Sequence, residues 1–171
     1  MENIPLEVDN GHYLSIDIGI RNNFTCYDSA GKTFIIKGFL NATHYYDKKI
    51  AHYQGISDAQ QVAKGIEYPK KSKKVLSLYN KKKNKVDDYI HKATRYVADY
   101  CQKMDIHTVV IGDMKGIREG SSLGRMNQQL HALPYAEIIQ KLEYKLAYNG
   151  VRLIRQKESY SSQCSPASEK V

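Results

Sequence analysis

The chain has 171 residues, an apolar share of 42% and a formal net charge of +8, which suit one globular domain with a proper core. No segment approaches the roughly 18 consecutive apolar residues of a membrane-spanning helix, and the start has neither the basic nor the apolar part of a signal peptide. The three cysteines are far apart, which argues against a disulfide framework and predicts a reducing, cytoplasmic setting.

The first predicted element is a strand over residues 13–20 that carries one aspartate. Alternation along this strand places Leu14, Ile16 and Ile18 on one face and Asp17, between small residues, on the other. Strand interiors are depleted in Asp, because a half-buried carboxylate loses hydration without regaining hydrogen bonds. A cation would compensate for that loss, so Asp17 is a candidate metal ligand. The alternative is a structural acid on a strand.

The remaining elements are two more strands, a long helix, a lysine-rich helix, a strand, a third helix and a final strand. Their predicted ranges are 24–28, 33–40, 42–64 with Asn41 as the N-cap, 86–104 with helical turns upstream, 108–113, 133–149 and 151–155. Three antiparallel strands followed by helix, strand, helix and strand match the ribonuclease-H-like α/β fold with a mixed sheet. The helical insertion after the third strand is longer than a minimal version of this fold needs.

The positive charge of the chain is concentrated between Pro69 and Val86. This stretch contains no acid and eight lysines, and without these eight the rest of the chain has no net charge. The eight residues, here called the lysine patch, are Lys70, Lys71, Lys73, Lys74, Lys81, Lys82, Lys83 and Lys85. A localised patch is typical of a contact with a nucleic-acid backbone, and the alternative is a solvated lysine-rich loop.

His91 and Lys92 follow the lysine patch on the same predicted helix. They are further candidates for phosphate contact, and for His91 the alternative is a role in packing between helices.

Two more acids lie at the ends of later strands, where they converge with the first strand in this fold. Asp113 ends the predicted strand 108–113, and Glu158 follows the last strand. Phosphodiester hydrolysis with two divalent metals needs several carboxylates around ions about 3.5–4 Å apart, and Mg²⁺ prefers carboxylate and water oxygens. Asp17, Asp113 and Glu158 are therefore candidate catalytic acids, with Asp17 and Glu158 as ligands of Mg²⁺ or Mn²⁺. For Asp113 the alternative is a loop acid or a helix cap.

Three segments in order resemble one known family. In the first, Asp17 is followed by Gly19, Asn22 and Thr25, which are two, five and eight positions on. The second is a His-Lys helix preceded by basic sequence, and the third leads up to Cys164. The segments span residues 15–25, 86–93 and 156–165. They resemble the RuvC-like nuclease half of the TnpB/OrfB transposon-encoded family, which is related to compact type V CRISPR effectors.

The resemblance implies an RNA-guided DNA endonuclease, with DNA and guide RNA as partners and Asp17 as the first catalytic acid. The glutamate usual at the end of the fourth strand falls on Gly112 here, with Asp113 next to it. Glu158 fits the position to which some relatives move this glutamate. No second cysteine completes a Cys-x-x-Cys pair after Cys164, so we expect no intact zinc site in this chain.

The resemblance also predicts the domain organisation. Residues 1–12 would be an N-terminal extension, and residues 13–171 a RuvC-like domain with a basic helical segment over 66–105 and an incomplete zinc-ribbon region at its end. The last catalytic aspartate of the family would lie beyond Val171. We therefore expect a truncated or degenerate relative that cuts poorly alone. One alternative is a nuclease-dead module that binds nucleic acid. The other is a structural scaffold, but a scaffold would leave the localised charge unexplained.

Overall fold

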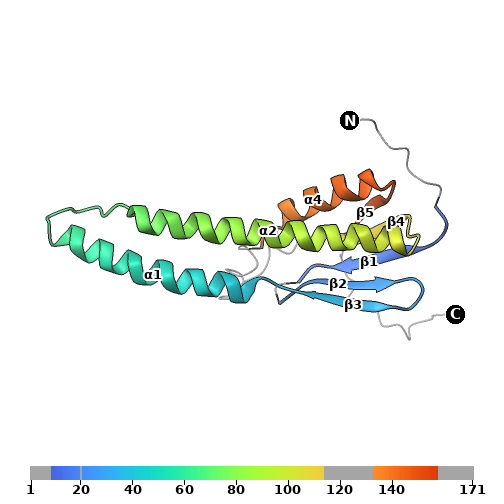
Figure 1. Cartoon of the computed structure of the whole chain (residues 1–171), viewed down its shortest axis with the longest axis horizontal. Helices are drawn as coiled ribbons and strands as arrows, with labels where there is room; N and C mark the ends of the chain where they lie inside the picture. The colour runs from blue at the N-terminus through green and yellow to red at the C-terminus, as the bar shows by residue number, and fades with distance from the viewer. Residues whose placement is uncertain (1–8, 20, 114–132, 158–171) are drawn as a thin grey trace.

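The computed structural model describes residues 9–19, 21–113 and 133–157 (Figure 1). Over these ranges, a five-stranded sheet packs against helices, and a helical hairpin (residues 40–85) extends past one end of the sheet. The elements are β1 (Tyr13–Asp17), β2 (Asn22–Asp28), β3 (Thr33–Lys37), α1 (Leu40–Val62), α2 (Lys73–Lys103), β4 (Thr108–Asp113), α4 (Tyr135–Tyr148) and β5 (Arg152–Lys157). None of the described helices is long and apolar enough to cross a membrane.

Strand β1 lies at the centre of the sheet, whose order is β3-β2-β1-β4-β5. It pairs antiparallel with β2 and parallel with β4, so that Ile16 lies opposite Cys26 on one side and Ile111 on the other. Strand β3 adds antiparallel to β2, and β5 adds parallel to β4. Helices connect the parallel strands. The predicted ribonuclease-H-like α/β fold, with a long helical insertion after β3, is confirmed.

One face of the sheet forms the core, as the alternation in β1 predicts. Leu14 and Ile16 are buried, as is Ile18 just after the strand, whereas Ser15 is half-buried and Asp17 is exposed. The buried face packs against the apolar sides of α2 and α4, and the largest fully buried side chains from these elements include Phe24, Ile90, Val97, Ile111, Ile138, Leu142 and Leu146. Removal of this apolar surface from water is the main force that holds the sheet and the two helices together.

Strand β1 ends at Asp17, three residues before the predicted end, because the chain turns there. The backbone N–H of Gly19 donates to the carbonyl oxygen of Asn22 over 3.0 Å, which closes a tight connection into β2. A Cβ atom at position 19 would lie 2.8 Å from the same carbonyl oxygen. The turn therefore requires glycine at this position.

The prediction that Asn41 caps the first long helix is wrong. The N-cap is Phe39, which makes no side-chain capping hydrogen bond, and α1 begins at Leu40 directly after it. Phe39 is buried and its ring lies 5.5 Å from that of Tyr89 in α2, edge to face. Burial of this ring brings the chain onto α2 and starts the helix earlier than its polar residues indicate.

Helix α2 has two halves that pack on different partners. Its N-cap is Ser72, whose hydroxyl accepts a hydrogen bond from the N–H of Val75 over 3.3 Å. In the first half, Val75 and Leu78 bury themselves with Ile50 of α1 in a small second core. The second half, from about Val86, packs on the sheet. The predicted helical turns upstream of residue 86 are confirmed, and they place most of the lysine patch on the helical hairpin.

A buried acid joins the β2–β3 turn to α2. Asp28 is 3% exposed and accepts hydrogen bonds from the N–H of Ala30 over 2.7 Å and from the hydroxyl of Tyr100 over 2.9 Å. Burial, together with the hydrogen bond to Asp28, raises the pKa of Tyr100 to about 12. The tyrosine is therefore neutral over the physiological range and keeps donating to the carboxylate.

We predict that Gly19→Ala lowers the free energy of unfolding by about 1–3 kcal/mol, because the added Cβ forces the β1–β2 turn apart. Urea unfolding of the full chain measures the change. Gly55→Ala is the matched control, since nothing lies within 4 Å of a Cβ built at this position in α1. Removal of a helical glycine should raise stability by about 0.5–1 kcal/mol. Two substitutions with the same effect would show that the turn tolerates a side chain.

Candidate catalytic edge and basic hairpin

The carboxyl ends of β1, β4 and β5 meet at one edge of the sheet, here called the catalytic edge. All three strands run parallel, and Asp17, Asp113 and Lys157 are their last residues. Asp113 lies opposite Lys157 in the β4–β5 register, and Glu158 is the next residue in the sequence, outside the described residues. The pairing thus brings the backbone of the predicted acid positions on β1 and β4 to the same edge.

Asp17 is exposed at this edge, and the expectation that it is a half-buried acid is wrong. It is the last residue of β1, on the face of the sheet opposite the one packed by α2 and α4. Its carboxylate makes no hydrogen bond or ion pair with any of the described residues. The candidate ligand atoms are therefore open to solvent, and desolvation is not what distinguishes this aspartate.

Strands β1 and β5 are not neighbours, because β4 lies between them. The β1–β4 register ends with Ile16 opposite Ile111, so Asp17 and Gly112 are the next residues of the two strands, and Gly112 lies opposite Gln156 of β5. Gly112 has no side chain, so no β4 side chain lies between Asp17 and Gln156 on this face of the sheet. Within the described ranges, no group of three His, Cys, Asp or Glu side chains could hold a metal ion. Asp17 is thus one fitting oxygen ligand, and the described side chains do not complete a metal site around it.

The lysine patch lies on the helical hairpin, away from the sheet (Figure 1). Lys82 is paired with Asp47 of α1 over 2.6 Å, with its side chain 27% exposed. Lys81 and Lys83, by contrast, are exposed and make no ion pair or hydrogen bond with the part of the chain that the structure describes. Most of the patch is therefore available to a polyanion, with Lys82 partly used by the fold.

His91 and Lys92 lie on the sheet-packed half of α2. Lys92 forms an i,i+4 ion pair with Asp88 over 2.8 Å, and its side chain is 75% exposed. The His91 ring is 4.0 Å from the Asp87 carboxylate, and its backbone carbonyl accepts a hydrogen bond from Lys145 of α4 over 2.6 Å. The His91 side chain is 49% exposed and the residue contacts α4 through its backbone alone, so both His91 and Lys92 lie at the surface of α2.

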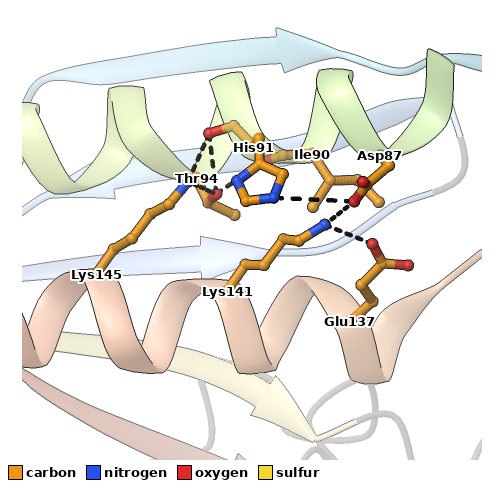
Figure 2. Close-up of polar contacts among 7 residues, drawn as sticks. All are labelled: Asp87, Ile90, His91, Thr94, Glu137, Lys141 and Lys145. Carbon is orange, nitrogen blue, oxygen red and sulfur yellow. Dashed lines mark hydrogen bonds and ion pairs between the residues drawn. The ribbon is translucent and has the colours of Figure 1, made fainter. Parts of the chain in front are cut away.

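Polar residues that the sequence analysis missed join α2 to α4 beside His91 (Figure 2). The Lys141 ammonium, with its side chain 11% exposed, is bonded to both Asp87 and Glu137. One turn further along α4, Lys145 donates to the hydroxyl of Thr94 over 2.8 Å. The one signal in the sequence was the i,i+4 spacing of Glu137 and Lys141, which is common on exposed helices.

The ion pair between Lys141 and Asp87 shifts the pKa of both groups. Burial lowers the pKa of Lys141, but the hydrogen bonds to Asp87 and Glu137 outweigh it and leave the pKa above its usual value. The hydrogen bond from Lys141 holds the pKa of Asp87 below its usual 3.8. Lys141 and Asp87 are therefore both ionised at neutral pH, and their pair joins α4 to α2.

The order of the strands and the helices packed on one face define the RuvC-like fold class. A family model described as a probable transposase, OrfB_IS605, matches residues 1–118, which is more than half of the chain. The chain belongs to this OrfB family.

Comparisons with individual proteins agree with this family. The chain is 24% identical over 160 residues to a TnpB-like protein of Methanocaldococcus jannaschii, a match that covers 91% of this chain and 56% of the relative. The chain thus spans about half the length of the curated relative that it matches.

Two solved structures share the fold. The first is a Cas12f1–sgRNA–target DNA complex, with a TM-score of 0.62 and 20% identity over 91% of this chain and 38% of that one. The second is a CRISPR–Cas12f ternary complex, with a TM-score of 0.64 and 19% identity over 93% of this chain and 31% of that one. The RuvC-like fold predicted from the sequence is confirmed.

We predict that Lys141→Met lowers the free energy of unfolding by about 0.5–1.5 kcal/mol at pH 7, because Asp87 and Glu137 lose their shared cation but stay partly hydrated. Lys92→Met is the matched control, and loss of this exposed i,i+4 pair should cost no more than about 0.5 kcal/mol.

The effect of Lys141→Met should also depend on pH. Because the pKa of Asp87 is lowered by folding, the stability from the pair is complete above the usual 3.8 and is lost as the pH falls through the lowered value. Urea unfolding between pH 7 and pH 3 should show the two proteins converging at the acid end. A difference that stays constant over this range would contradict the ion-pair explanation.

Proposed function

We propose that the chain is the RuvC-like nuclease core of an RNA-guided DNA endonuclease that hydrolyses phosphodiester bonds with Mg²⁺ or Mn²⁺. The observation that carries the proposal is the exposed Asp17 carboxylate, which no described residue bonds, at the edge where β1, β4 and β5 all end. The two similar solved structures are complexes named for Cas12f, one of them with an sgRNA and a target DNA, which supports nucleic acids as partners here. The lysine patch supplies the matching charge on this chain.

Asp17 and Glu158 would hold the metal, with Asp113 as the alternative second ligand. When bound, divalent ions would activate a water molecule and neutralise charge on the leaving oxygen. Asp17 suits this role because its oxygens are solvent-exposed and are not used by hydrogen bonds from the described residues. Gly112 contributes by placing no side chain between β1 and β5 on this row of the sheet. Lysines of the helical hairpin would hold the phosphate backbone.

The second candidate function is a module that binds nucleic acid without cutting it. The observation in its favour is that the described residues contain no group of three metal-ligating side chains. This function needs only the lysine patch, so it makes the same binding prediction and the opposite cleavage prediction.

We predict that Asp17→Asn weakens Mn²⁺ binding by about tenfold or more, measured by isothermal titration calorimetry, because it replaces a charged ligand oxygen by an amide. Asp99→Asn, on the surface of α2 and paired with Arg95 over 2.8 Å, is the control and should leave Mn²⁺ affinity unchanged. Glu158→Gln and Asp113→Asn identify the second ligand, as one of the two should reproduce the loss.

Cleavage separates the two candidate functions. DNA is incubated with Mg²⁺ or Mn²⁺ and either wild type or Asp17→Asn. Cleavage by the wild type that Asp17→Asn abolishes supports the nuclease. Equal activity in both proteins removes Asp17 from the mechanism. Binding without any cleavage favours the binding module if Asp17→Asn also leaves the Mn²⁺ affinity unchanged.

We predict that replacing Lys81 and Lys83 by Ala reduces the salt dependence of binding to duplex DNA. Each lost phosphate contact lowers the slope of log K against log salt by roughly 0.9. Fluorescence anisotropy titrations between about 50 and 200 mM salt measure the slope. Lys32 and Lys103, exposed lysines outside the hairpin, provide a double substitution with the same loss of charge. Equal slopes for the two variants would show that only net charge matters.

A further inference from the structure

The tip of the helical hairpin is a fixed loop. The side-chain amide of Gln61, near the end of α1, brackets Lys70 on the far side of the loop: its nitrogen donates to the Lys70 carbonyl over 2.8 Å, and its oxygen accepts from the Lys70 N–H over 2.9 Å. The same nitrogen also lies 3.1 Å from the Ser57 hydroxyl. Gly65, with a φ of +79°, lets the chain turn back at the start of the loop. The backbone between α1 and α2 is thus closed by paired hydrogen bonds.

Tyr68 is presented by this loop with 77% of its surface exposed. Pro69 follows it and restricts the backbone of Tyr68 to extended conformations. Among the described residues, no ring, cation or hydrogen bond engages the Tyr68 side chain. The fold therefore holds a large aromatic ring in solvent without using it in packing.

The other exposed tyrosines of the hairpin are different, because each has a lysine ammonium over its ring. The distances to the ring centroid are 4.5 Å for Lys49 over Tyr45, 5.4 Å for Lys74 over Tyr53 and 4.5 Å for Lys71 over Tyr79. These cation–π contacts occupy one face of each ring and position the ammonium groups. Tyr68 is the hairpin tyrosine with both faces open in the part of the chain that the structure describes.

The charge around Tyr68 indicates what would cover it. Lys64, Lys70 and Lys71 lie near it in the sequence with one acid, Glu67, and the rest of the lysine patch follows along α2. An aromatic ring next to a row of cations is the combination that binds single-stranded nucleic acid, where bases stack on the ring and phosphates follow the charges. Base pairs inside a duplex hide their faces, so a ring at a loop tip can stack only on an unpaired or terminal base.

We propose that Tyr68 stacks on an unpaired base of an RNA or DNA strand whose phosphates lie along the lysine patch. This inference rests on the proposed nucleic-acid function and adds a binding site for an unpaired nucleotide at the tip of the hairpin. The hydrogen bonds of Gln61 fix the loop backbone that carries Tyr68, which reduces the backbone entropy lost on stacking.

The test compares the full chain with Tyr68→Ala and Tyr68→Phe at one salt concentration. The probes are fluorescein-labelled 20-nucleotide single-stranded RNA, single-stranded DNA and duplex DNA, and anisotropy gives the dissociation constants. Tyr68→Ala should weaken binding of at least one single strand by about tenfold, the loss expected for one stacked base. Tyr68→Phe, which keeps the ring, should stay within about twofold of wild type, and duplex binding should not change. The strand that responds identifies the source of the base.

Tyr148→Ala is the matched control, because Tyr148 is 74% exposed but lies on α4, away from the lysine patch. It should leave all three affinities unchanged. Equal affinities of Tyr68→Ala and Tyr68→Phe for both single strands would overturn the stacking proposal, as would an equal loss on duplex DNA. The double variant of Lys81 and Lys83 distinguishes failure of the stacking proposal from failure of the proposed nucleic-acid function. If binding depends on these lysines but not on Tyr68, only the stacking site is removed. Absence of binding by the wild type removes the nucleic-acid function as well.

Discussion

The parallel pairing of β1 with β4 is the constraint on which the rest of the structure depends. Ile16 and Ile111 lie side by side in this register, and both are buried against the helices. A shift of one residue would move each strand's apolar set to the opposite face, so burial of these side chains fixes the register. The register in turn decides that Asp17 lies beside Gly112 at the catalytic edge. The position of the candidate acid is thus a consequence of packing on the other face of the sheet.

The helical hairpin holds many like charges next to the folded sheet domain. Lysines in the first half of α2 repel one another, and α1 has no continuous apolar stripe with which to cover them. The small core of Ile50, Val75 and Leu78, together with the pair between Lys82 and Asp47, holds the two helices together. This leaves most of the charge on outward surfaces, at the side and tip of the hairpin, where a polyanion can reach it.

Local patterns in the sequence predicted most helices and strands. The features that they did not predict depend on contacts between elements far apart in the chain. Alternation identified the buried face of β1, and the range 108–113 of β4 is as predicted, because strand periodicity depends on neighbours along the chain. The exposure of Asp17 depends on a turn closed by Gly19 and on a sheet face without described helices, which periodicity does not contain. The start of α1 depends on Phe39 meeting Tyr89 from a distant helix. Propensity favoured Asn41 there, and tertiary packing overrode it.

The sheet also bears on which acid partners Asp17. Positions on one face alternate along a strand, and the registers place Gly112 and Gln156 in the same row as Asp17. In β4 this row holds Gly112, next to the buried Ile111 of the opposite face. Among the described side chains of the row, Asp17 therefore supplies the carboxylate, and Gly112 leaves the space beside it open.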